Sequence, residues 1–461
     1  MLTARVGFVV YGVHKDGLKD PTGVPFIDDE LIEANKKALR DAGLELVEYP
    51  IVVASKKEAR ECLREFKLKD EVDAIILYSG TWVWAAHLIA AVRDYASTGN
   101  GILLWNDPGG RSWGGSVGGL VLHAAMREVD LKHRFVYAAA DDSGTIEKIT
   151  SWCRASAVRK RLNQSTYGVL GGRGMGQTCG VADPSQWMKM FGVDLDSRDT
   201  TRLLQIAGSV SDAELEKARE RIRPLFSEPI PDSDAADRSI RLYLALKKIM
   251  AEEEWAGYVI QSFPGLGDDY SATSFPQSMM LEDRVASMTL SDFNSLLTVI
   301  LLNSLSADPV YYGDLQYVDK KSGEMRIICD GACPPSLAGK LKPATFSRHG
   351  IETEGAAGGL AVQLVCKTGE GVMARVGRCN GEFELVICRC SMYEPEAATL
   401  QDKLEECGIP FWPHAFIRVD ADVDALLEVW SNEYGCIAYG THLYEDLVAF
   451  AEQAGIKVIA L

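Results

Sequence analysis

The sequence lacks several features that would place it in a specialised class. Basic residues are outnumbered, with 48 lysines and arginines against 65 aspartates and glutamates and a net charge of −17. Nucleic-acid binding needs a basic stripe, so we expect no nucleic-acid partner. No apolar run is long enough to cross a bilayer, and we expect no membrane partner. Residues 1–5 lack the pattern of a signal peptide, which predicts a cytoplasmic protein.

Cysteine pairs with the spacing of a zinc site are also missing. The 11 cysteines are scattered along the chain. Cys388 and Cys390 are one residue apart in a strand-like run, so they should lie on the same face. Without a signal peptide, such cysteines are predicted to be buried thiols rather than disulfides or zinc ligands.

The chain is too long for one hydrophobic core. With 461 residues, of which 47% are apolar and 25% charged, it has the composition of an ordinary globular protein. A chain of this length is expected to form two to four domains.

The first third alternates strand and helix patterns. Continuous apolar runs at residues 6–11, 72–78, 102–105 and 135–140 are separated by helical spacing such as that of residues 28–42. This order predicts a parallel sheet covered on both faces. Ligands bind at the carboxyl ends of such strands, so the segments 79–84 and 106–115 are candidate binding loops or simply tight connections.

A second α/β unit is predicted from residue 166. A strand at 167–170 leads into Gly171-Gly172-Arg173-Gly174-Met175-Gly176, which can bring backbone amides close to a ligand but lacks the ending of a Walker loop. Further strands are expected at 255–261 and 310–315. Residues 281–292 are predicted to be a loop before a long helix at 293–305, with Thr289 or Ser291 as its cap and Asp292 in its first turn.

The last third has strands at hairpin spacing, at residues 359–367, 371–377 and 383–390, which predicts an antiparallel or barrel-like domain. A helix at 443–454 and a strand at 457–461 close the chain. The predicted domains are residues 1–165, 166–328 and 329–461.

Four stretches together resemble the L-fucose isomerase and L-arabinose isomerase family. Their order and spacing match over most of the chain, although no single motif is specific. They are residues 170–176 with 187–199, then Thr289-Leu290-Ser291-Asp292 with Tyr312-Gly313-Asp314-Leu315, then Trp412-Pro413-His414, and finally residues 430–435 through Tyr439-Gly440.

The resemblance implies a fold and a chemistry. The fold is two Rossmann-like parallel α/β domains followed by a C-terminal antiparallel β-rich domain. Members interconvert aldoses and ketoses with a divalent metal, usually manganese, and two acidic groups move a proton through an enediol. Members of that family form hexamers or other trimer-based homo-oligomers, and their sites lie between subunits, so the resemblance implies a homo-oligomer here. A small-molecule sugar is therefore the expected partner.

The sequence departs from the family at two of its three metal ligands. The family's Glu position holds Leu290, its Asp position keeps Asp314, and its His position holds Tyr434. Leucine offers no donor, neutral tyrosine is a poor manganese ligand, and one carboxylate holds a hard cation weakly.

Three explanations follow from this departure. A metal site could be rebuilt from neighbours, namely Asp292, Asp314, Asp330, His414 or Glu433. The pocket could carry metal-free chemistry, such as that of a lyase or epimerase with Tyr434 as acid. The chain could also be a non-catalytic sugar-binding or assembly paralogue.

Further residues match positions near the family's substrate. Trp82 and Met175 would contact the sugar, and Gln261 follows a strand where the family has a substrate-contacting Gln. Trp412, His414 and His442 complete this substrate-binding set; the structural alternatives are a core role for Trp82, a turn at His414 and a helix-cap neighbour at His442. Arg375 is expected to form an interior or interface ion pair.

The sequence therefore predicts an aldose–ketose isomerase, or an enzyme of related proton transfer, acting on a small sugar. Asp314, Asp292 and Tyr434 are the predicted catalytic residues. Asp314 and Glu433 are the predicted metal ligands, and Mn²⁺ is the cofactor that the resemblance implies. The sequence does not name the sugar.

Overall fold

The computed structural model describes residues 2–13, 27–109, 115–174, 177–348, 356–430 and 434–461. The chain forms two compact units. The N-terminal unit consists of Leu2–Arg161 together with Glu445–Gly455. The C-terminal unit consists of Leu162–Tyr444 together with Ile456–Leu461. Each unit is described by itself below.

The N-terminal unit is built on a five-stranded parallel sheet with the order β2-β1-β3-β4-β5. The predicted parallel arrangement is confirmed. Every residue of β3 and β4 is buried, which explains their continuous apolar runs. The strands are β1 (Arg5–Tyr11), β2 (Glu45–Glu48), β3 (Ala74–Ser79), β4 (Gly101–Asn106) and β5 (Arg134–Tyr137).

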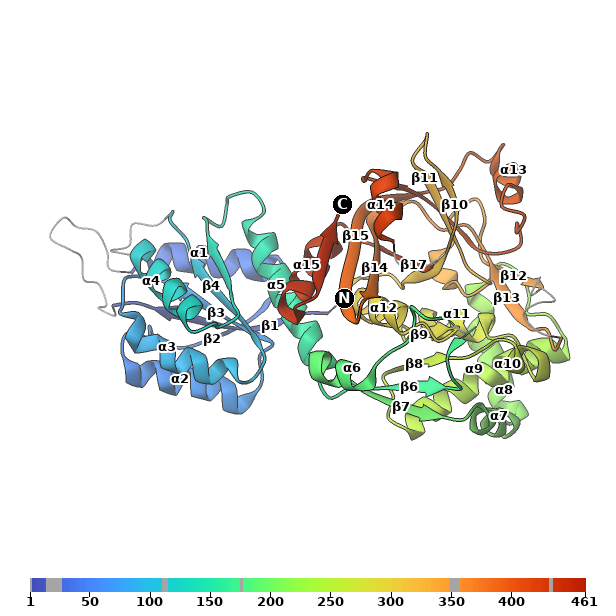
Figure 1. The fold of residues 1–461 in the computed structure, drawn as a ribbon, viewed down its shortest axis with the longest axis horizontal. Helices are drawn as coiled ribbons and strands as arrows, with labels where there is room; N and C mark the ends of the chain where they lie inside the picture. Colours follow the sequence, from blue (N-terminus) through green and yellow to red (C-terminus); the bar gives the residue numbers. More distant parts are fainter. Residues whose placement is uncertain (1, 14–26, 110–114, 175–176, 349–355, 431–433) are drawn as a thin grey trace. The chain divides into compact units, whose positions relative to one another are not determined.

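Helices cover this sheet. Side chains of α2, α3 and α4 share one hydrophobic core with β1, β3 and β4, and Figure 1 shows α2 and α3 side by side on one side of the sheet with α1 on the other. The helices are α1 (Asp29–Asp41), α2 (Lys56–Lys69), α3 (Ala85–Ala96), α4 (Gly115–Glu128) and α5 (Thr145–Leu162).

The helix α15 (Leu443–Ala454) returns to the N-terminal unit. The Asp446 carboxylate, which is fully buried, accepts hydrogen bonds from Nε and Nη2 of Arg154 on α5 at 2.7–3.0 Å. Gln453 donates to the Trp152 carbonyl at 2.9 Å and accepts from Ser156 at 3.1 Å. These polar contacts fix α15 against α5.

The C-terminal unit contains a four-stranded parallel sheet with the order β7-β6-β8-β9. Its strands are β6 (Thr166–Leu170), β7 (Asp194–Arg198), β8 (Gly257–Ile260) and β9 (Ala286–Thr289). The prediction of a loop throughout residues 281–292 is wrong, because β9 lies within it. Only four residues long and without a strong apolar alternation, β9 gives a weak sequence signal even though it is completely buried.

The helices of this unit include the long apolar α12, whose predicted bounds are confirmed. Its N-cap is Asp292, which accepts from the backbone N–H groups of Asn294 and Ser295, rather than Thr289 or Ser291. The helices are α6 (Pro184–Phe191), α7 (Thr200–Gly208), α8 (Asp212–Ile222), α9 (Asp234–Glu252), α10 (Gly265–Asp269), α11 (Ser274–Glu282), α12 (Phe293–Leu305), α13 (Leu400–Glu405) and α14 (Val423–Val429).

The second sheet of this unit closes on itself, as the hairpin spacing predicts. The order β14-β17-β10-β11-β16-β15, with a further β14–β15 pairing, joins antiparallel strands into a ring, and β18 adds to β15 in parallel. The strands are β10 (Tyr311–Asp319), β11 (Glu324–Ile328), β14 (Gly369–Cys379), β15 (Glu382–Tyr393), β16 (His414–Val419), β17 (Tyr434–Tyr439) and β18 (Lys457–Ala460); β12 (Thr345–Arg348) and β13 (Leu360–Gln363) pair separately. The ring includes β10 and β11 and so begins before residue 329, where the sequence places the third domain.

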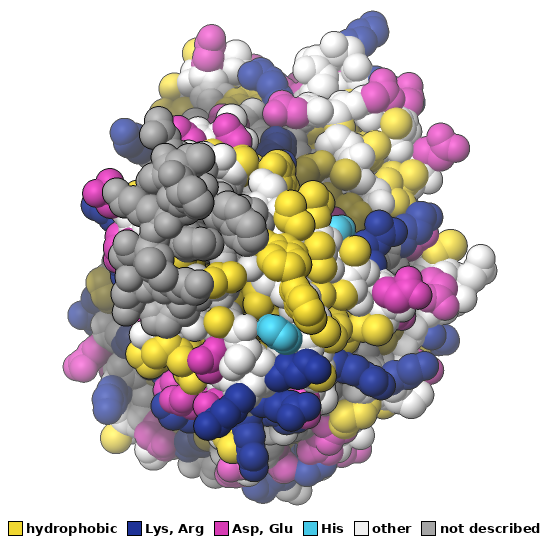
Figure 2. Space-filling model, turned by 90° about the vertical axis from the view of Figure 1, so that its left-hand side faces the viewer, with side chains coloured by type: hydrophobic (Ala, Val, Ile, Leu, Met, Phe, Trp, Pro, Cys, Tyr) yellow, Lys and Arg dark blue, Asp and Glu magenta, His cyan; other side chains and the backbone are white. Residues whose placement is uncertain are grey.

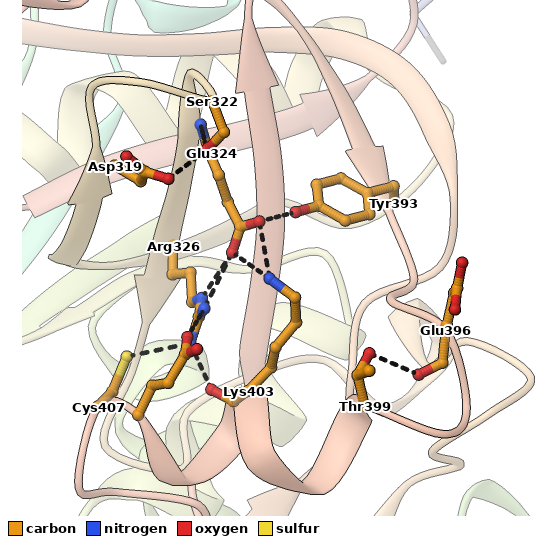
Figure 3. Close-up of polar contacts among 10 residues, drawn as sticks. Asp319, Ser322, Glu324, Arg326, Tyr393, Glu396, Thr399, Lys403 and Cys407 are labelled. Carbon is orange, nitrogen blue, oxygen red and sulfur yellow. Dashed lines mark hydrogen bonds and ion pairs between the residues drawn. The ribbon is translucent and has the colours of Figure 1, made fainter.

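An ionic cluster supports one side of this ring (Figure 3). Arg326 on β11 is fully buried, donates to Glu324 at 2.9 and 3.1 Å, and lies between the rings of Tyr317 and Phe416 at 4.2 and 4.8 Å. Glu324 also accepts from Lys403 of α13 at 3.0 Å, and from the Tyr393 hydroxyl. The cluster ties β11, β15 and α13 together.

The surface of the N-terminal unit carries an apolar stripe on α4. Val117, Leu120 and Val121 are exposed there, and Figure 2 shows apolar side chains gathered on the face that it draws. No helix within the described residues is long and apolar enough to span a membrane. All 11 cysteines are free thiols, eight of them buried, and Cys379 is exposed.

Candidate functional site

Three loops meet at the carboxyl ends of the parallel strands in the C-terminal unit. The glycine-rich loop follows β6, Gln261 follows β8, and Leu290 follows β9. Gly172 donates its backbone N–H to Gln261 Oε1 at 2.9 Å. A Cβ on Gly174 would lie 1.7 Å from the Leu290 carbonyl oxygen, so only glycine allows this approach. This edge of a parallel sheet is where open α/β folds bind their ligands.

The loop after β9 has strained backbone. Leu290 and Ser291 both adopt the left-handed region, with φ of 62° and 56°. This conformation costs a residue with a side chain about 1–2 kcal/mol. Such strain persists where surrounding contacts enforce it, and it gathers at functional sites. The strained residue Leu290 is also the position at which the sequence resemblance implies a Glu.

Asp292 holds the end of this loop. Its carboxylate is fully buried, caps α12, accepts from Ser295 Oγ at 2.7 Å, and pairs with Arg375 Nη2 at 3.1 Å. Arg375 on β14 also donates to the Tyr434 carbonyl at 3.2 Å. The predicted ion pair of Arg375 is confirmed. Asp292, predicted as an acid/base, is thus placed in the cap and the ion pair that hold Tyr434 in position.

Asp314 and Tyr434 lie side by side on two neighbouring strands of the ring. They are directly opposed in the antiparallel register of β10 and β17, so their side chains project to the same face with Cβ atoms about 5 Å apart. Asp314 is half-buried and accepts from Gln316 Nε2 at 3.3 Å, while Tyr434 is buried. Asp314 and Tyr434, the positions that the resemblance aligns with an Asp and a His ligand, are therefore neighbours.

The loop after β9 is bonded to the same strand. The Tyr312 hydroxyl lies 2.9 Å from Thr289 Oγ1 and accepts from the Thr289 backbone N–H at 3.3 Å. Tyr312 is two residues before Asp314, and Thr289 is one residue before Leu290. The structure thus brings the parts of the chain that hold Leu290, Asp314 and Tyr434 together.

The other predicted residues are distributed differently. His414 is fully buried, stacks on Phe416 with ring centroids 6.0 Å apart, and has Nε2 3.1 Å from the Ile409 carbonyl; burial lowers its pKa to about 4. Trp412 is buried beside it. His442 is half-buried, with Nε2 3.3 Å from the Leu305 carbonyl. Trp82 belongs to the N-terminal unit, 6.3 Å from the Trp84 ring. Met175 and Glu433 lie outside the described residues.

The described residues do not fit the manganese that the resemblance implies. Of the three family positions only Asp314 offers a carboxylate, whereas Mn²⁺ favours several oxygen or imidazole donors. Among the described parts of the chain, no group of three or more His, Cys, Asp or Glu side chains could hold a metal ion. No step below is therefore assigned to a metal.

Sequence reasoning missed two features of this site. The left-handed conformation of Leu290 and Ser291 has no glycine or asparagine to signal it. The bond between Tyr312 and Thr289 joins residues 23 positions apart, and only the motif order hinted that these segments meet.

Comparison with known proteins points to sugar isomerases at low identity. The sulfoquinovose isomerase of Clostridium sp. (strain MSTE9) is 27% identical over 271 residues, which is 57% of this chain and 59% of that protein. Those of Priestia aryabhattai and Priestia megaterium (strain ATCC 12872 / QMB1551) are each 21% identical over 356 residues, 75% of this chain and 77% of theirs. This chain is thus similar to sugar isomerases of carbohydrate metabolism.

No family model matches the chain. Among solved structures, the glucose-galactose binding protein GanP of Geobacillus stearothermophilus aligns with a TM-score of 0.18 and 11% identity, over 65% of this chain and 92% of that one. A likeness at this score carries no argument. The likeness to L-fucose isomerase itself stays a prediction.

Proposed function

We propose that this protein is an aldose–ketose isomerase of a small sugar, and that sulfoquinovose is the first substrate to test. The observation that carries the proposal is the pairing of Asp314 with Tyr434, beside the strained loop after β9. Support also comes from the similarity to sulfoquinovose isomerases along 75% of the chain.

The chemistry needs a group that takes a proton from one carbon and returns it to the next. A carboxylate within reach of both carbons can do this. We assign that role to Asp314, which is half-buried rather than sealed. Tyr434, on the same face, would donate its O–H to the sugar oxygen that gains negative charge in the enediol, because a positioned donor stabilises such charge.

Other residues of this edge would bind the sugar. Gln261 uses Oε1 to hold the glycine-rich loop, so its amide NH₂ group is the donor that it can offer to a sugar hydroxyl. His442, Trp412, Trp82 and Met175 remain proposed substrate contacts, whereas the full burial of His414 favours its structural alternative. Asp292 acts in this proposal by positioning Tyr434 through Arg375.

A manganese ion and a homo-oligomer, trimer or hexamer, also remain proposals. Manganese would require Glu433 and a further donor beside Asp314. The exposed apolar stripe of α4 is compatible with a contact between copies, since large exposed apolar patches commonly mark interaction surfaces. Metal analysis after manganese loading, and mass by light scattering, test these two points.

The activity is tested with a panel of aldoses that includes sulfoquinovose and L-fucose. The purified protein is incubated with each sugar, with added manganese and after chelation, and ketose is detected by NMR. The proposal expects ketose from at least one aldose. Thermal stabilisation by a sugar without any product would show a binding protein instead, and activity that survives chelation would show metal-free chemistry.

A further inference from the structure

The N-terminal unit contains a cavity of about 460 Å³ at the amino ends of β4 and β5. The candidate binding loops at residues 79–84 and 106–115 follow the carboxyl ends of the strands, so the cavity lies at the other edge of the sheet. Its walls come from the connection between α3 and β4, from residues 130–134, from α5, and from the end of α15. The volume lies within the range of small-molecule sites.

Arg159 in the cavity wall has no counter-charge. It is half-buried on α5 and makes no ion pair or hydrogen bond with any residue that the structure describes. Burial lowers the pKa of its guanidinium group. The cations near it on α5 are engaged, since Arg154 pairs with Asp446 and Lys160 pairs with Asp70. A partly desolvated, unpaired charge is costly, and an anion would relieve that cost.

Trp152 on the same helix forms another part of the wall. The residue is 5% exposed and lines the cavity, and its Nε1–H has no hydrogen-bond partner among the described residues. One face of its ring carries the Arg134 guanidinium at 5.0 Å. This nitrogen is sealed from solvent, so Trp152 contributes its ring to the wall and the Arg159 guanidinium is the unsatisfied donor that the wall presents.

The remaining charges leave the cavity slightly cationic. Arg134 is neutralised by Glu452. Burial lowers the pKa of His133, whose Nδ1 donates to the Leu131 carbonyl at 2.7 Å, so this ring stays neutral. Lys132 is exposed at the rim, and Asp130 is the remaining carboxylate of the wall.

We propose that this cavity binds a small organic phosphate, with the phosphate group held by Arg159 and Lys132. A guanidinium fork suits a tetrahedral oxyanion. Such a group has enough oxygens to accept from both side chains, and the cavity has room for a body of monosaccharide size. Asn100 and Gln453 also line the cavity.

The test is calorimetric titration of the full-length protein with a hexose 6-phosphate and, separately, with inorganic phosphate. The test variant is Arg159→Gln. Arg161→Gln is the matched control, because Arg161 lies on the same helix, is exposed and does not line the cavity. Asp314→Asn separates this cavity from the proposed isomerase site.

Hexose phosphate should bind the wild type, Arg161→Gln and Asp314→Asn alike, and at least tenfold more weakly to Arg159→Gln. Inorganic phosphate that binds as tightly, with the same dependence on Arg159, would make free phosphate the ligand. The melting temperature of Arg159→Gln without phosphate should not fall below that of the wild type, because an unpaired charge is removed. Absence of binding at millimolar concentration, or equal binding by Arg159→Gln, would overturn the proposal.

Discussion

The His414 side chain is fully buried, and its ring stacks on the ring of Phe416. Burial lowers its pKa to about 4, from an ordinary value near 6.5. The folded state therefore resists protonation of this ring, whereas the unfolded chain accepts the proton near pH 6.5. The resulting stability is fully present above pH 6.5 and is lost as the pH falls towards 4.

We expect His414→Gln to weaken this acid dependence. Between pH 7 and pH 4 the wild type should lose about 3 kcal/mol more unfolding free energy than the variant, which cannot be protonated there. Urea unfolding at several pH values measures the difference. His442→Gln, at a half-buried histidine of the same unit, is the control. Parallel curves for the wild type and His414→Gln would show that His414 is not buried as the structure places it.

For single residues, the sequence predicts which ones belong to the candidate site better than it predicts what each of them contacts. The motif order pointed to Leu290, Asp314 and Tyr434, and the structure brings their segments together. The sequence did not anticipate that Asp292 caps α12 and pairs with Arg375. An aspartate that caps a helix is the same residue type as an aspartate that acts as an acid or base. Only tertiary contacts distinguish the structural role from the catalytic one.

Among the elements, length and periodicity decided which ones could be predicted. The helices α12 and α15 are long and apolar on the buried side, and their bounds were predicted correctly. The strand β9 has only four residues, and its local pattern predicts a loop instead. A local sequence pattern does not determine the order of strands in a sheet. The sequence therefore predicts an antiparallel or barrel-like domain, but not that β14 pairs with both β15 and β17.

The cluster around Arg326 should contribute to the stability of the ring (Figure 3). Glu324→Gln leaves the buried Arg326 guanidinium without its buried carboxylate, and the remaining partner Glu406 is half-exposed. We therefore expect the unfolding free energy at pH 7 to fall by about 3 kcal/mol. Although burial raises the pKa of Glu324, hydrogen bonds from Tyr393, Lys403 and Arg326 lower it overall. The effect should therefore be present above pH 4.5 and shrink as the pH falls below it.

Denaturant unfolding of Glu324→Gln at pH 7 and pH 3.5 checks this prediction. Glu396→Gln is the matched control, because Glu396 contributes its backbone carbonyl rather than its carboxylate to the bond with Thr399. A Glu324→Gln protein as stable as the control at pH 7 would contradict the role assigned to the cluster.

For the whole molecule, the C-terminal helix α15 belongs to the N-terminal unit. The sequence predicts this helix but not the unit that it packs against. An amphipathic pattern indicates that one face of a helix is buried, but it does not identify the element that covers this face. Asp446 and Arg154, 292 positions apart in the chain, make the contact.

Asp446→Asn should therefore loosen the N-terminal unit, at the opposite end of the sequence. Hydrogen–deuterium exchange should accelerate in β3 and β4, since a buried ion pair loses one partner at a cost of about 3 kcal/mol. Exchange in β10 and β14 should stay as in the wild type. Glu128→Gln, at the exposed end of α4, is the control. Unchanged exchange in β3 and β4 would show that α15 does not stabilise this unit.

The central claim is that Asp314 moves the proton of a sugar. The most direct measurement is the rate at which sulfoquinovose, or whichever aldose of the panel reacts, is converted to ketose by Asp314→Asn and by the wild type. The charge-matched control is Asp232→Asn, at an exposed loop residue far from the site in sequence. We predict a loss of at least a hundredfold in Asp314→Asn with an unchanged melting temperature, and a wild-type rate for Asp232→Asn. An Asp314→Asn enzyme that forms ketose at the wild-type rate would contradict the account.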